Sequence, residues 1–195
     1  VFTLADLGTQ VLEAGPELAA FKNGPYPALA DDKVRYVGQA YAACVAPTRA
    51  LAEDLAERVS ADIETLPAVV DVVEAMQPQA ARLFDHWPDN AYIRASVIEG
   101  DIASVSKAPI QLKRRFRMNR QATVPLECRG VLAYWDPRME ELVIYLSTQG
   151  PHVMRLGLAQ ALNLPEHKVR VIAPDVGGGF GGKNRLLPEE IAVAA

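Results

Sequence analysis

The chain of 195 residues is 50% hydrophobic and 23% charged, a composition typical of a globular protein and unlike that of a disordered one. Its formal charge of −4 and isoelectric point near 5.4 disfavour nucleic acid as a partner, because phosphate binding needs a basic face. No apolar run approaches the roughly 18 residues of a membrane helix, and the first residues lack the features of a signal peptide, so we expect a cytoplasmic protein that does not enter a membrane.

The two cysteines, Cys44 and Cys128, lie far apart and show no metal-ligand spacing. We therefore expect no metal site built by this chain, and we expect both thiols to be small buried residues in a reducing compartment. The chain begins with Val1 and ends within what reads as the start of a helix. We accordingly expect an excerpt from a longer polypeptide.

The first part of the chain predicts a small α/β unit. Glycine and proline breakers keep every element short near the N-terminus, and residues 33–46 then predict one or two strands. A helix should follow Thr48, whose hydroxyl can cap it, and residues 61–66 alternate like a strand. We place the end of this unit near Met76 and a linker rich in Pro and Asp at residues 77–91.

Residues 92–195 predict a second α/β unit. A turn at residues 136–141 should join two strands into a hairpin, and residues 151–163 predict a helix with a proline in its first turn. The basic residues of the run 113–117 alternate with apolar residues, which favours the solvent-exposed face of a strand over a phosphate site. The candidate strands are residues 92–99, 110–118, 129–135, 142–147 and 169–172.

The last of these strands runs into a loop in which five of the seven residues from Gly177 to Lys183 are glycine. Because glycine loses the most backbone entropy on folding, so many glycines indicate that something approaches this backbone closely. Bare amide N–H groups can point at one acceptor, such as a phosphate, an oxo group or a carboxylate. A flexible linker is the alternative, but the sequence predicts a strand directly before the loop and a helix after it, and no serine-rich segment flanks it.

Two generic motifs also fit the loop. Gly177, Gly179 and Gly182 satisfy the dinucleotide pattern G-x-G-x-x-G, although the acidic residue expected about 20 positions later would fall beyond the last residue. The phosphate-loop pattern G-x-x-x-x-G-K is also satisfied, but Asn184 stands where a Ser or Thr hydroxyl would hold magnesium, which disfavours an ATPase or GTPase. A non-catalytic nucleotide- or phosphate-binding module that uses the loop up to Lys183 is the alternative function, and a scaffold remnant is a third.

The run VRVIAPDVGGGFGGK at residues 169–183 closely resembles the cofactor loop of the large, molybdopterin-binding subunits of the xanthine dehydrogenase, aldehyde oxidase and aerobic carbon monoxide dehydrogenase family. The run STQGPH at 147–152 resembles the second cofactor loop of this family. Residues 34–39, 48–54 and 66–71 resemble the end of its α/β hammerhead domain. The likeness spans nearly the whole chain.

The resemblance implies an α+β fold, in which the C-terminal part of an α/β hammerhead domain at 1–76 and the linker at 77–91 precede the N-terminal part of a mixed α/β molybdopterin-binding domain at 92–195. It implies a fragment of an oxidoreductase of the molybdenum hydroxylase family, like carbon monoxide dehydrogenase or aldehyde oxidase, that oxidises or hydroxylates an aldehyde, carbon monoxide or an N-heterocycle with water as the oxygen source. The xanthine-oxidising branch has glutamate at the position of Asn184, which disfavours purines.

The resemblance also implies site residues. Gln149 would place its side-chain amide near an oxygen ligand of the molybdenum, and the ring of Phe180 would lie beside the metal. A glutamine satisfied by the backbone and a core phenylalanine are the alternatives. Glu127 and Arg129 match a family segment or form a weak ion pair at a strand edge. The residues whose backbone amides would face the cofactor are Gly178, Gly179, Phe180 and Gly181.

The sequence leaves open whether Lys183 contacts an anion or substrate or is exposed to solvent. The family's catalytic glutamate lies beyond the last residue, so we expect no catalytic residue here and a fragment that is inactive and free of molybdenum on its own. For the full-length protein the resemblance implies a molybdenum–molybdopterin cofactor in a dinucleotide form. It also implies an FAD-binding medium subunit and an iron–sulfur (2Fe-2S) small subunit as partners, in a homo-oligomer of the complex.

Overall fold

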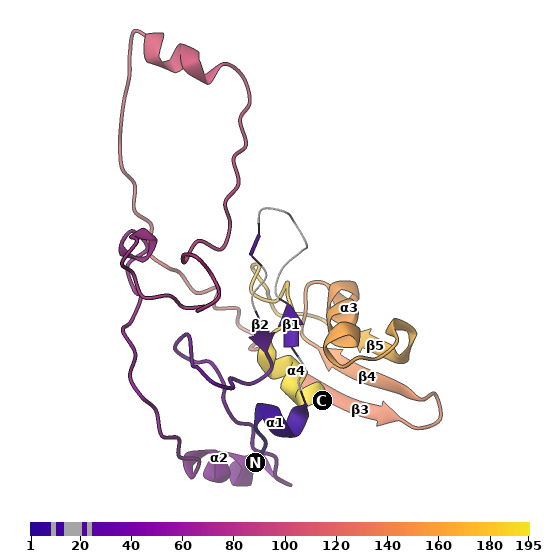
Figure 1. Cartoon of the computed structure of the whole chain (residues 1–195). Coiled ribbons are helices and arrows are strands. Elements are labelled where there is room, and N and C mark those ends of the chain that lie inside the picture. The colour runs from indigo at the N-terminus through magenta and orange to yellow at the C-terminus, as the bar shows by residue number, and fades with distance from the viewer. Residues whose placement is uncertain (9–10, 14–20, 23–24) are drawn as a thin grey trace.

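The computed structural model describes residues 1–8, 11–13, 21–22 and 25–195. Helices and strands are mixed along the chain, and the longest of them lie in its last third (Figure 1). The α-helices are α1 (Leu4–Leu7), α2 (Arg49–Glu57), α3 (Pro151–Ala161) and α4 (Pro188–Ala194). The strands are β1 (Val11–Glu13), β2 (Pro25–Pro27), β3 (Val131–Asp136), β4 (Glu141–Leu146) and β5 (Val169–Ile172), and the 3-10 helices are η1 (Glu74–Met76), η2 (Ile102–Lys107) and η3 (Glu166–Lys168).

A three-stranded sheet in the order β3-β4-β5 organises the C-terminal part. β3 and β4 form an antiparallel hairpin in which Val131 lies opposite Leu146. β4 and β5 pair in parallel, with Leu142 opposite Val169, and α3 makes the connection that parallel strands require. The strands predicted at 129–135, 142–147 and 169–172 and the helix predicted at 151–163 are thus confirmed to within two residues at each end.

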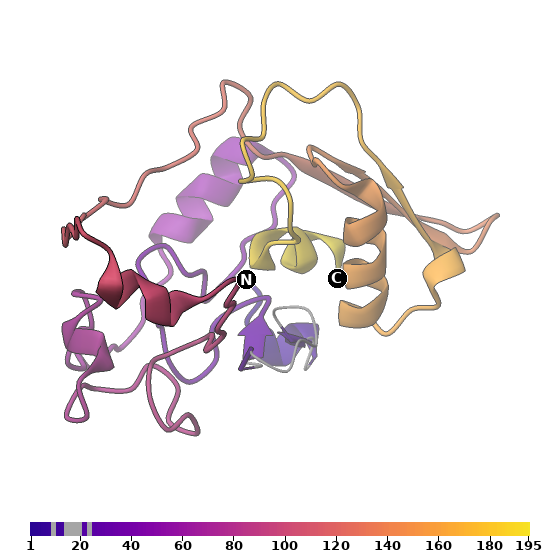
Figure 2. The ribbon, with the colours of Figure 1, turned by 90° about the horizontal axis from the view of Figure 1, so that it is seen from above.

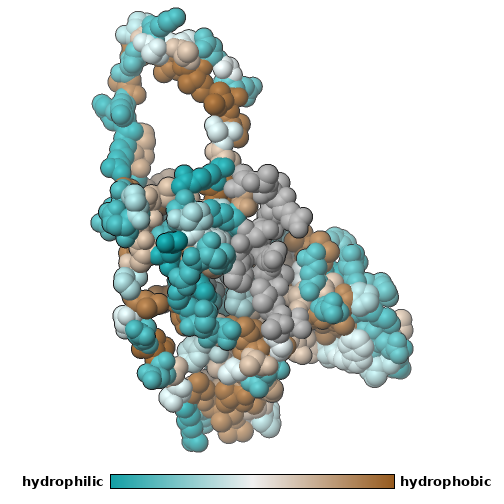
Figure 3. All heavy atoms as spheres, viewed as in Figure 1, coloured by the Kyte–Doolittle hydropathy of each residue, from teal (hydrophilic) through white to brown (hydrophobic). Residues whose placement is uncertain are grey.

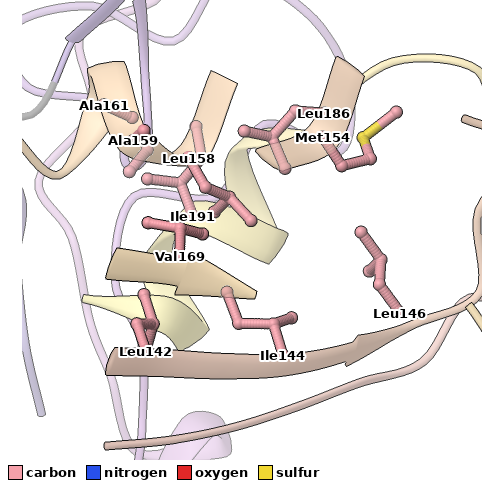
Figure 4. Packing of buried hydrophobic residues seen from close by; sticks show 11 residues of the cluster. Leu142, Ile144, Leu146, Met154, Leu158, Ala159, Ala161, Val169, Leu186 and Ile191 are labelled. Carbon is pink, nitrogen blue, oxygen red and sulfur yellow. The ribbon is translucent and has the colours of Figure 1, made fainter. Parts of the chain in front are cut away.

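The core lies between this sheet and the helices α3 and α4. Alternate residues of a strand point to one face, so Leu142, Ile144 and Leu146 of β4 point together toward the helices (Figure 4). They pack with the buried side chains of α3 and with Ile191 of α4, which lies beside α3 when the molecule is seen from above (Figure 2). The buried helix residues in this cluster are Met154, Leu158, Ala159, Ala161 and Ile191.

The N-terminal part has less packing. β1 and β2 form a two-stranded antiparallel sheet, and α2 begins where the sequence predicts it, with the Thr48 hydroxyl accepting a hydrogen bond from the Leu51 N–H at 3.3 Å. However, α2 buries none of its residues. Its apolar side chains are therefore not covered in this structure. Helix propensity, the cap at Thr48 and the Arg49–Glu53 ion pair stabilise the helix locally.

The strands predicted at residues 33–46, 61–66, 92–99 and 110–118 are wrong, because none of these segments forms a strand in the structure. Only isolated bridges occur, between Phe2 and Ala43 and between Phe21 and Ile93. A strand needs a hydrogen-bonded neighbour, and no neighbouring strand lies beside these segments in the described part of the chain. The compact strand–helix–strand unit predicted before Met76 is therefore not seen.

Residues 94–124, here called the arm, leave the body of the molecule and return to it with η2 at the far end (Figure 1). Hydrophobic side chains lie open along the arm (Figure 3), and those of Phe116 and Met118 are 88% and 91% exposed. The total accessible surface is 14890 Å², whereas a compact monomer of 21.2 kDa exposes only about 9,100 Å². The chain therefore leaves apolar surface uncovered that a compact domain would bury.

Two further observations concern single predictions. Cys44 is partly buried but Cys128 is exposed, so the prediction that both thiols are buried is wrong for Cys128, which lies in the irregular segment before β3. Among the described residues, no helix has the length and apolar character needed to cross a membrane.

Ile144→Ala should lower the free energy of unfolding by about 2–5 kcal/mol, because it empties a space in the middle of the core. Leu132→Ala on the neighbouring strand is the matched control, and it should change stability by less than about 0.5 kcal/mol because that side chain is largely exposed. Urea unfolding of the two variants and the parent chain measures both effects. Equal losses for the two variants would contradict this placement of the core.

Candidate functional site

Three segments meet at one edge of the sheet. β4 and β5 are parallel, so their carboxyl ends lie at the same edge, and the antiparallel β3 begins there. The residues before β3, the residues after β4 and the glycine loop after β5 (residues 177–183) are thereby brought together. Direct contacts confirm this, since the Gln149 N–H and the Thr148 hydroxyl both donate to the Lys183 carbonyl oxygen, at 2.9 and 3.1 Å.

An ionic cluster, in which the lysine is buried and the carboxylate is partly exposed, fastens the loop to the sheet edge. The Lys183 ammonium donates to Glu127 Oε2 at 2.8 Å, to the Glu127 carbonyl oxygen at 2.9 Å and to Ser147 Oγ at 2.8 Å. The same Glu127 oxygen accepts from the Ser147 hydroxyl at 2.7 Å and from the Gly177 N–H at 2.8 Å. These bonds, above all the one from Lys183, lower the pKa of the Glu127 carboxyl to about 2.

Gln149 is held from one end of its side chain. Its Oε1 accepts from the Gly181 N–H at 3.0 Å and from the Lys183 N–H at 3.3 Å. Because both partners are donors, the carboxamide oxygen must face the loop and the –NH₂ group must face away from it. Within the described part of the chain that –NH₂ group has no hydrogen-bond partner, and Gln149 is exposed. Gln149 therefore offers two free donor hydrogens next to the loop.

Close approach of the chain explains the glycines at two positions. A Cβ at Gly179 would lie 2.5 Å from Cδ of Gln149, and a Cβ at Gly177 would lie 2.6 Å from Cβ of Glu127. Neither contact is possible without moving a residue that holds the loop. The glycine-rich sequence thus lets the backbone lie directly against the side chains of Gln149 and Glu127.

The loop pairs four of its seven backbone N–H groups and leaves three unpaired. Gly177 donates to Glu127, Gly181 and Lys183 donate to Gln149, and Gly182 donates to the Gly179 carbonyl oxygen at 2.8 Å. The three consecutive N–H groups without a partner among the described residues are those of Gly178, Gly179 and Phe180. Consecutive unpaired amides of this kind form a site for an electron-rich oxygen.

Phe180 adopts an unusual conformation next to these amides. Its φ angle is +51°, in the left-handed region that aromatic residues avoid, and the residue is 73% exposed. The alternative that Phe180 is a core residue is therefore wrong. Strained backbone and an exposed aromatic ring each cost free energy, and such costs are typical of places where a ligand binds.

The structure brings together the residues that the sequence singles out, Gln149 and the loop from Gly178 to Gly181. It also gives Lys183 a role that sequence reasoning left open: its side chain is 1% exposed, and it neither faces solvent nor presents a free proton to a phosphate. The phosphate-loop reading of this lysine is therefore unsupported. The alternative that Glu127 and Arg129 form a weak ion pair is wrong, because Arg129 pairs with Glu189 at 3.4 Å and Glu127 pairs with Lys183.

Ser147, Glu127 and Lys183 form a cluster that was missed. The sequence holds one local indication of this cluster, because a lysine directly after a glycine loop lies where it can contact the residues that the loop packs against. However, its acceptors lie 36 and 56 positions away in the sequence, and no local pattern connects them.

Gly179→Ala should displace the Gln149 side chain and lower the free energy of unfolding by about 1–3 kcal/mol, because the new methyl group overlaps Gln149 Cδ. Gly130→Ala is the control, since nothing lies within 4 Å of its added Cβ. Urea unfolding measures stability, and the NMR signals of the Gln149 side-chain amide report its displacement. Unchanged Gln149 signals in the Gly179 variant would contradict the geometry.

The Glu127 carboxyl should make the loop sensitive to acid. Since its pKa falls from the ordinary 4.5 to about 2 in the folded protein, the stability that its ionised form contributes is present above pH 4.5 and is lost as the pH falls toward 2. Unfolding free energies of the parent chain and of Glu127→Gln should therefore differ at pH 7 and converge between pH 4.5 and 2. A constant difference across this range would refute the assignment.

Known proteins are similar to this chain in sequence and in fold. Residues 83–195 match the family model of the molybdopterin cofactor-binding domain. The chain is 37% identical to the nicotine 6-hydroxylase large subunit of Paenarthrobacter nicotinovorans, over 85% of this chain and 20% of that protein. It is also 37% identical to the carbon monoxide dehydrogenase large chain of Afipia carboxidovorans, over 94% of this chain and 24% of that protein.

A solved structure is also similar to this chain. Quinoline 2-oxidoreductase from Pseudomonas putida 86 superposes with a TM-score of 0.88 at 32% identity, over 98% of this chain and 25% of that one. The chain thus spans about a fifth to a quarter of the length of these relatives. The predicted resemblance is confirmed, and the chain belongs to the molybdopterin cofactor-binding domain family of the molybdenum hydroxylase large subunits.

Proposed function

We propose that this chain forms part of the molybdenum-cofactor-binding large subunit of an oxidoreductase that hydroxylates or oxidises a small substrate with water as the source of oxygen. The observation that carries the proposal is the row of N–H groups at Gly178, Gly179 and Phe180, next to the –NH₂ group of Gln149, none of which has a partner in the described part of the chain. These donors lie at the carboxyl edge of parallel strands, which is where ligands bind in open α/β sheets.

The residues present fit such a cofactor. A molybdopterin complex carries oxygen atoms on its metal and phosphate oxygens on its pterin tail, and both kinds of atom accept hydrogen bonds from amides. When bound, the cofactor supplies the redox chemistry and the oxygen-transferring metal, whereas the protein supplies binding and orientation. The described residues offer main-chain donors without side-chain bulk and one carboxamide donor, which suits a large ligand resting on the backbone.

Each site residue then has a separate task. The N–H groups of Gly178, Gly179 and Phe180 would donate to the cofactor, and the Gln149 –NH₂ group would donate to an oxygen ligand of the metal. The N–H of Gly181 already donates to Gln149, so we propose that Gly181 acts by fixing the orientation of that carboxamide. The exposed ring of Phe180 would form a wall that keeps water from the metal.

We further propose that residues 1–76 are the C-terminal part of an α/β hammerhead domain, that 77–91 link it to the next domain, and that 92–195 begin the cofactor-binding domain. The uncovered apolar side chains of α2 and of the arm support this proposal, because such surface is normally buried by more protein. The superposition on the quinoline enzyme also extends over 98% of the chain, the greater part of the arm included. The rest of a longer polypeptide would cover these surfaces.

The printed names of the relatives support the proposed assembly. They are called large subunits or large chains, and one is a subunit of the 6-hydroxypseudooxynicotine dehydrogenase complex. We therefore propose FAD-binding medium and 2Fe-2S small subunits as partners, a dinucleotide form of the pterin, and a homo-oligomer of the whole complex in the cytoplasm. For the substrate we propose an aldehyde, carbon monoxide or an N-heterocycle, and Asn184 disfavours a purine.

Expression of the complete coding sequence in a host that makes the cofactor should yield about one molybdenum and one pterin per polypeptide. Gln149→Ala should lower the molybdenum content or the activity per folded protein by about tenfold, as loss of an oriented partner of a metal ligand does. Gln160→Ala on the exposed side of α3 is the control. Metal analysis and mass spectrometry of the released pterin measure the content.

The 195-residue chain alone should contain no molybdenum and should not bind ATP or NAD. A full-length protein without molybdenum, or tight nucleotide binding by the chain, would refute the proposed function.

A further inference from the structure

We infer that Lys183, Glu127 and Ser147 form an ionic clamp that holds the glycine loop in the shape that leaves its central N–H groups free. Lys183 is then a positioning residue and does not bind the ligand itself. The inference rests on the proposed function only for what the free N–H groups bind. The clamp is a property of the chain alone.

The lysine has no proton left for a ligand. An ammonium group has three N–H donors, and Lys183 has three acceptors within 2.9 Å. They are the carbonyl oxygen and the carboxylate Oε2 of Glu127 and the hydroxyl oxygen of Ser147. Its side chain is almost completely buried. A buried ammonium is stable only when it is paired and hydrogen-bonded, so moving it toward a ligand would leave the Glu127 carboxylate without its partner.

One carboxylate oxygen ties both ends of the loop. Glu127 Oε2 accepts from the N–H of Gly177 at the first residue of the loop and from the ammonium of Lys183 at the last. The backbone pairs at the same place, since the Glu127 N–H donates to the Gly177 carbonyl oxygen at 3.3 Å. The two ends of the loop are therefore fixed to the same residue before β3.

Fixing the ends matters because the segment between them has unusual freedom. Four of the five residues between Gly177 and Lys183 are glycine, and a free loop of this composition samples many conformations. Gln149 adds a third fixed point by accepting from Gly181 and Lys183. What remains between the fixed points is the triplet Gly178, Gly179 and Phe180, so the clamp preorganises these donors and reduces the entropy that ligand binding would otherwise cost.

The test compares three variants of the chain with a control. Lys183→Met removes the ammonium, Glu127→Met removes the carboxylate, and the double variant replaces both charged side chains by apolar ones. The control is Lys168→Met, which removes a lysine that contacts Glu140 Oε2 at 3.3 Å and the Met139 carbonyl oxygen at 3.4 Å in an exposed turn of the same sheet. Amide hydrogen exchange and thermal unfolding are measured for all of them.

In both single variants the amides of Gly177 and Gly181 should exchange at least about tenfold faster, while the amides of β4 and β5 keep their relative order of protection. The double variant should recover much of the midpoint of thermal unfolding, because it removes the buried ammonium that Glu127→Met leaves without a counter-charge. It should nevertheless keep fast exchange at Gly177, which has lost its acceptor. Lys168→Met should change neither amide.

Unchanged exchange at Gly177 and Gly181 in the folded double variant would overturn the clamp, and so would equal acceleration in the Lys168 control. A single variant that fails to fold leaves the double variant to decide. For the complete protein, the clamp predicts at least about tenfold less molybdenum per folded polypeptide in the double variant than in the parent. If the parent itself contains no molybdenum, the proposed function fails and the exchange data still decide the clamp.

Discussion

The parallel pairing of β4 with β5 is the constraint on which the rest of the structure depends. It places residues 147–149 and the glycine loop at the same edge of the sheet, although 32 positions separate Gln149 from Gly181. A slip of two residues in this register would keep the same face of β5 in the core but would move the loop by about 6–7 Å. No hydrogen bond between the loop and Gln149 or Glu127 would survive such a shift. The core residues Ile144, Leu158 and Ile191 therefore set the position of the site through the register that they stabilise.

The loop combines features that would each destabilise a domain without a ligand. Three consecutive N–H groups have no partner among the residues that the structure describes. An aromatic residue in the left-handed region adds strain. The fully paired cluster around Lys183 shows that polar groups at this edge can be satisfied by the chain itself. The contrast between the paired ends of the loop and its unpaired centre supports the proposal that the centre binds a ligand.

Sequence patterns predicted the C-terminal elements well because β3, β4, α3 and β5 find their partners within the chain. The alternating segment 110–118 follows the same period-two pattern but is open to solvent, because alternation indicates which residues share a face and not whether another strand lies beside them. The motif around Gln149 and the glycine loop singled out residues that the structure brings together, and the glycine loop does lie close against the side chains of Gln149 and Glu127. The local pattern alone did not decide the position of the Lys183 side chain, since a lysine after a glycine loop can equally well bind phosphate or pair with a carboxylate of the same chain.

The arm extends the same reasoning from the site to the whole chain. Apolar side chains such as Phe116 and Met118 would collapse onto any available surface if the chain alone determined the conformation, because exposed apolar area costs roughly 25 cal/mol per Å². The open arm, most of which lies within the superposition on the quinoline enzyme, therefore supports the proposal that further protein covers it. On its strand-like period Lys113, Arg115 and Arg117 share one face, and Leu112, Phe116 and Met118 share the other with Arg114, so a docked arm can bury most of one row while the other stays in water. The arm and the glycine loop thus support the two proposals in the same way, since each leaves groups uncovered that a second body would complement, protein for the arm and cofactor for the loop.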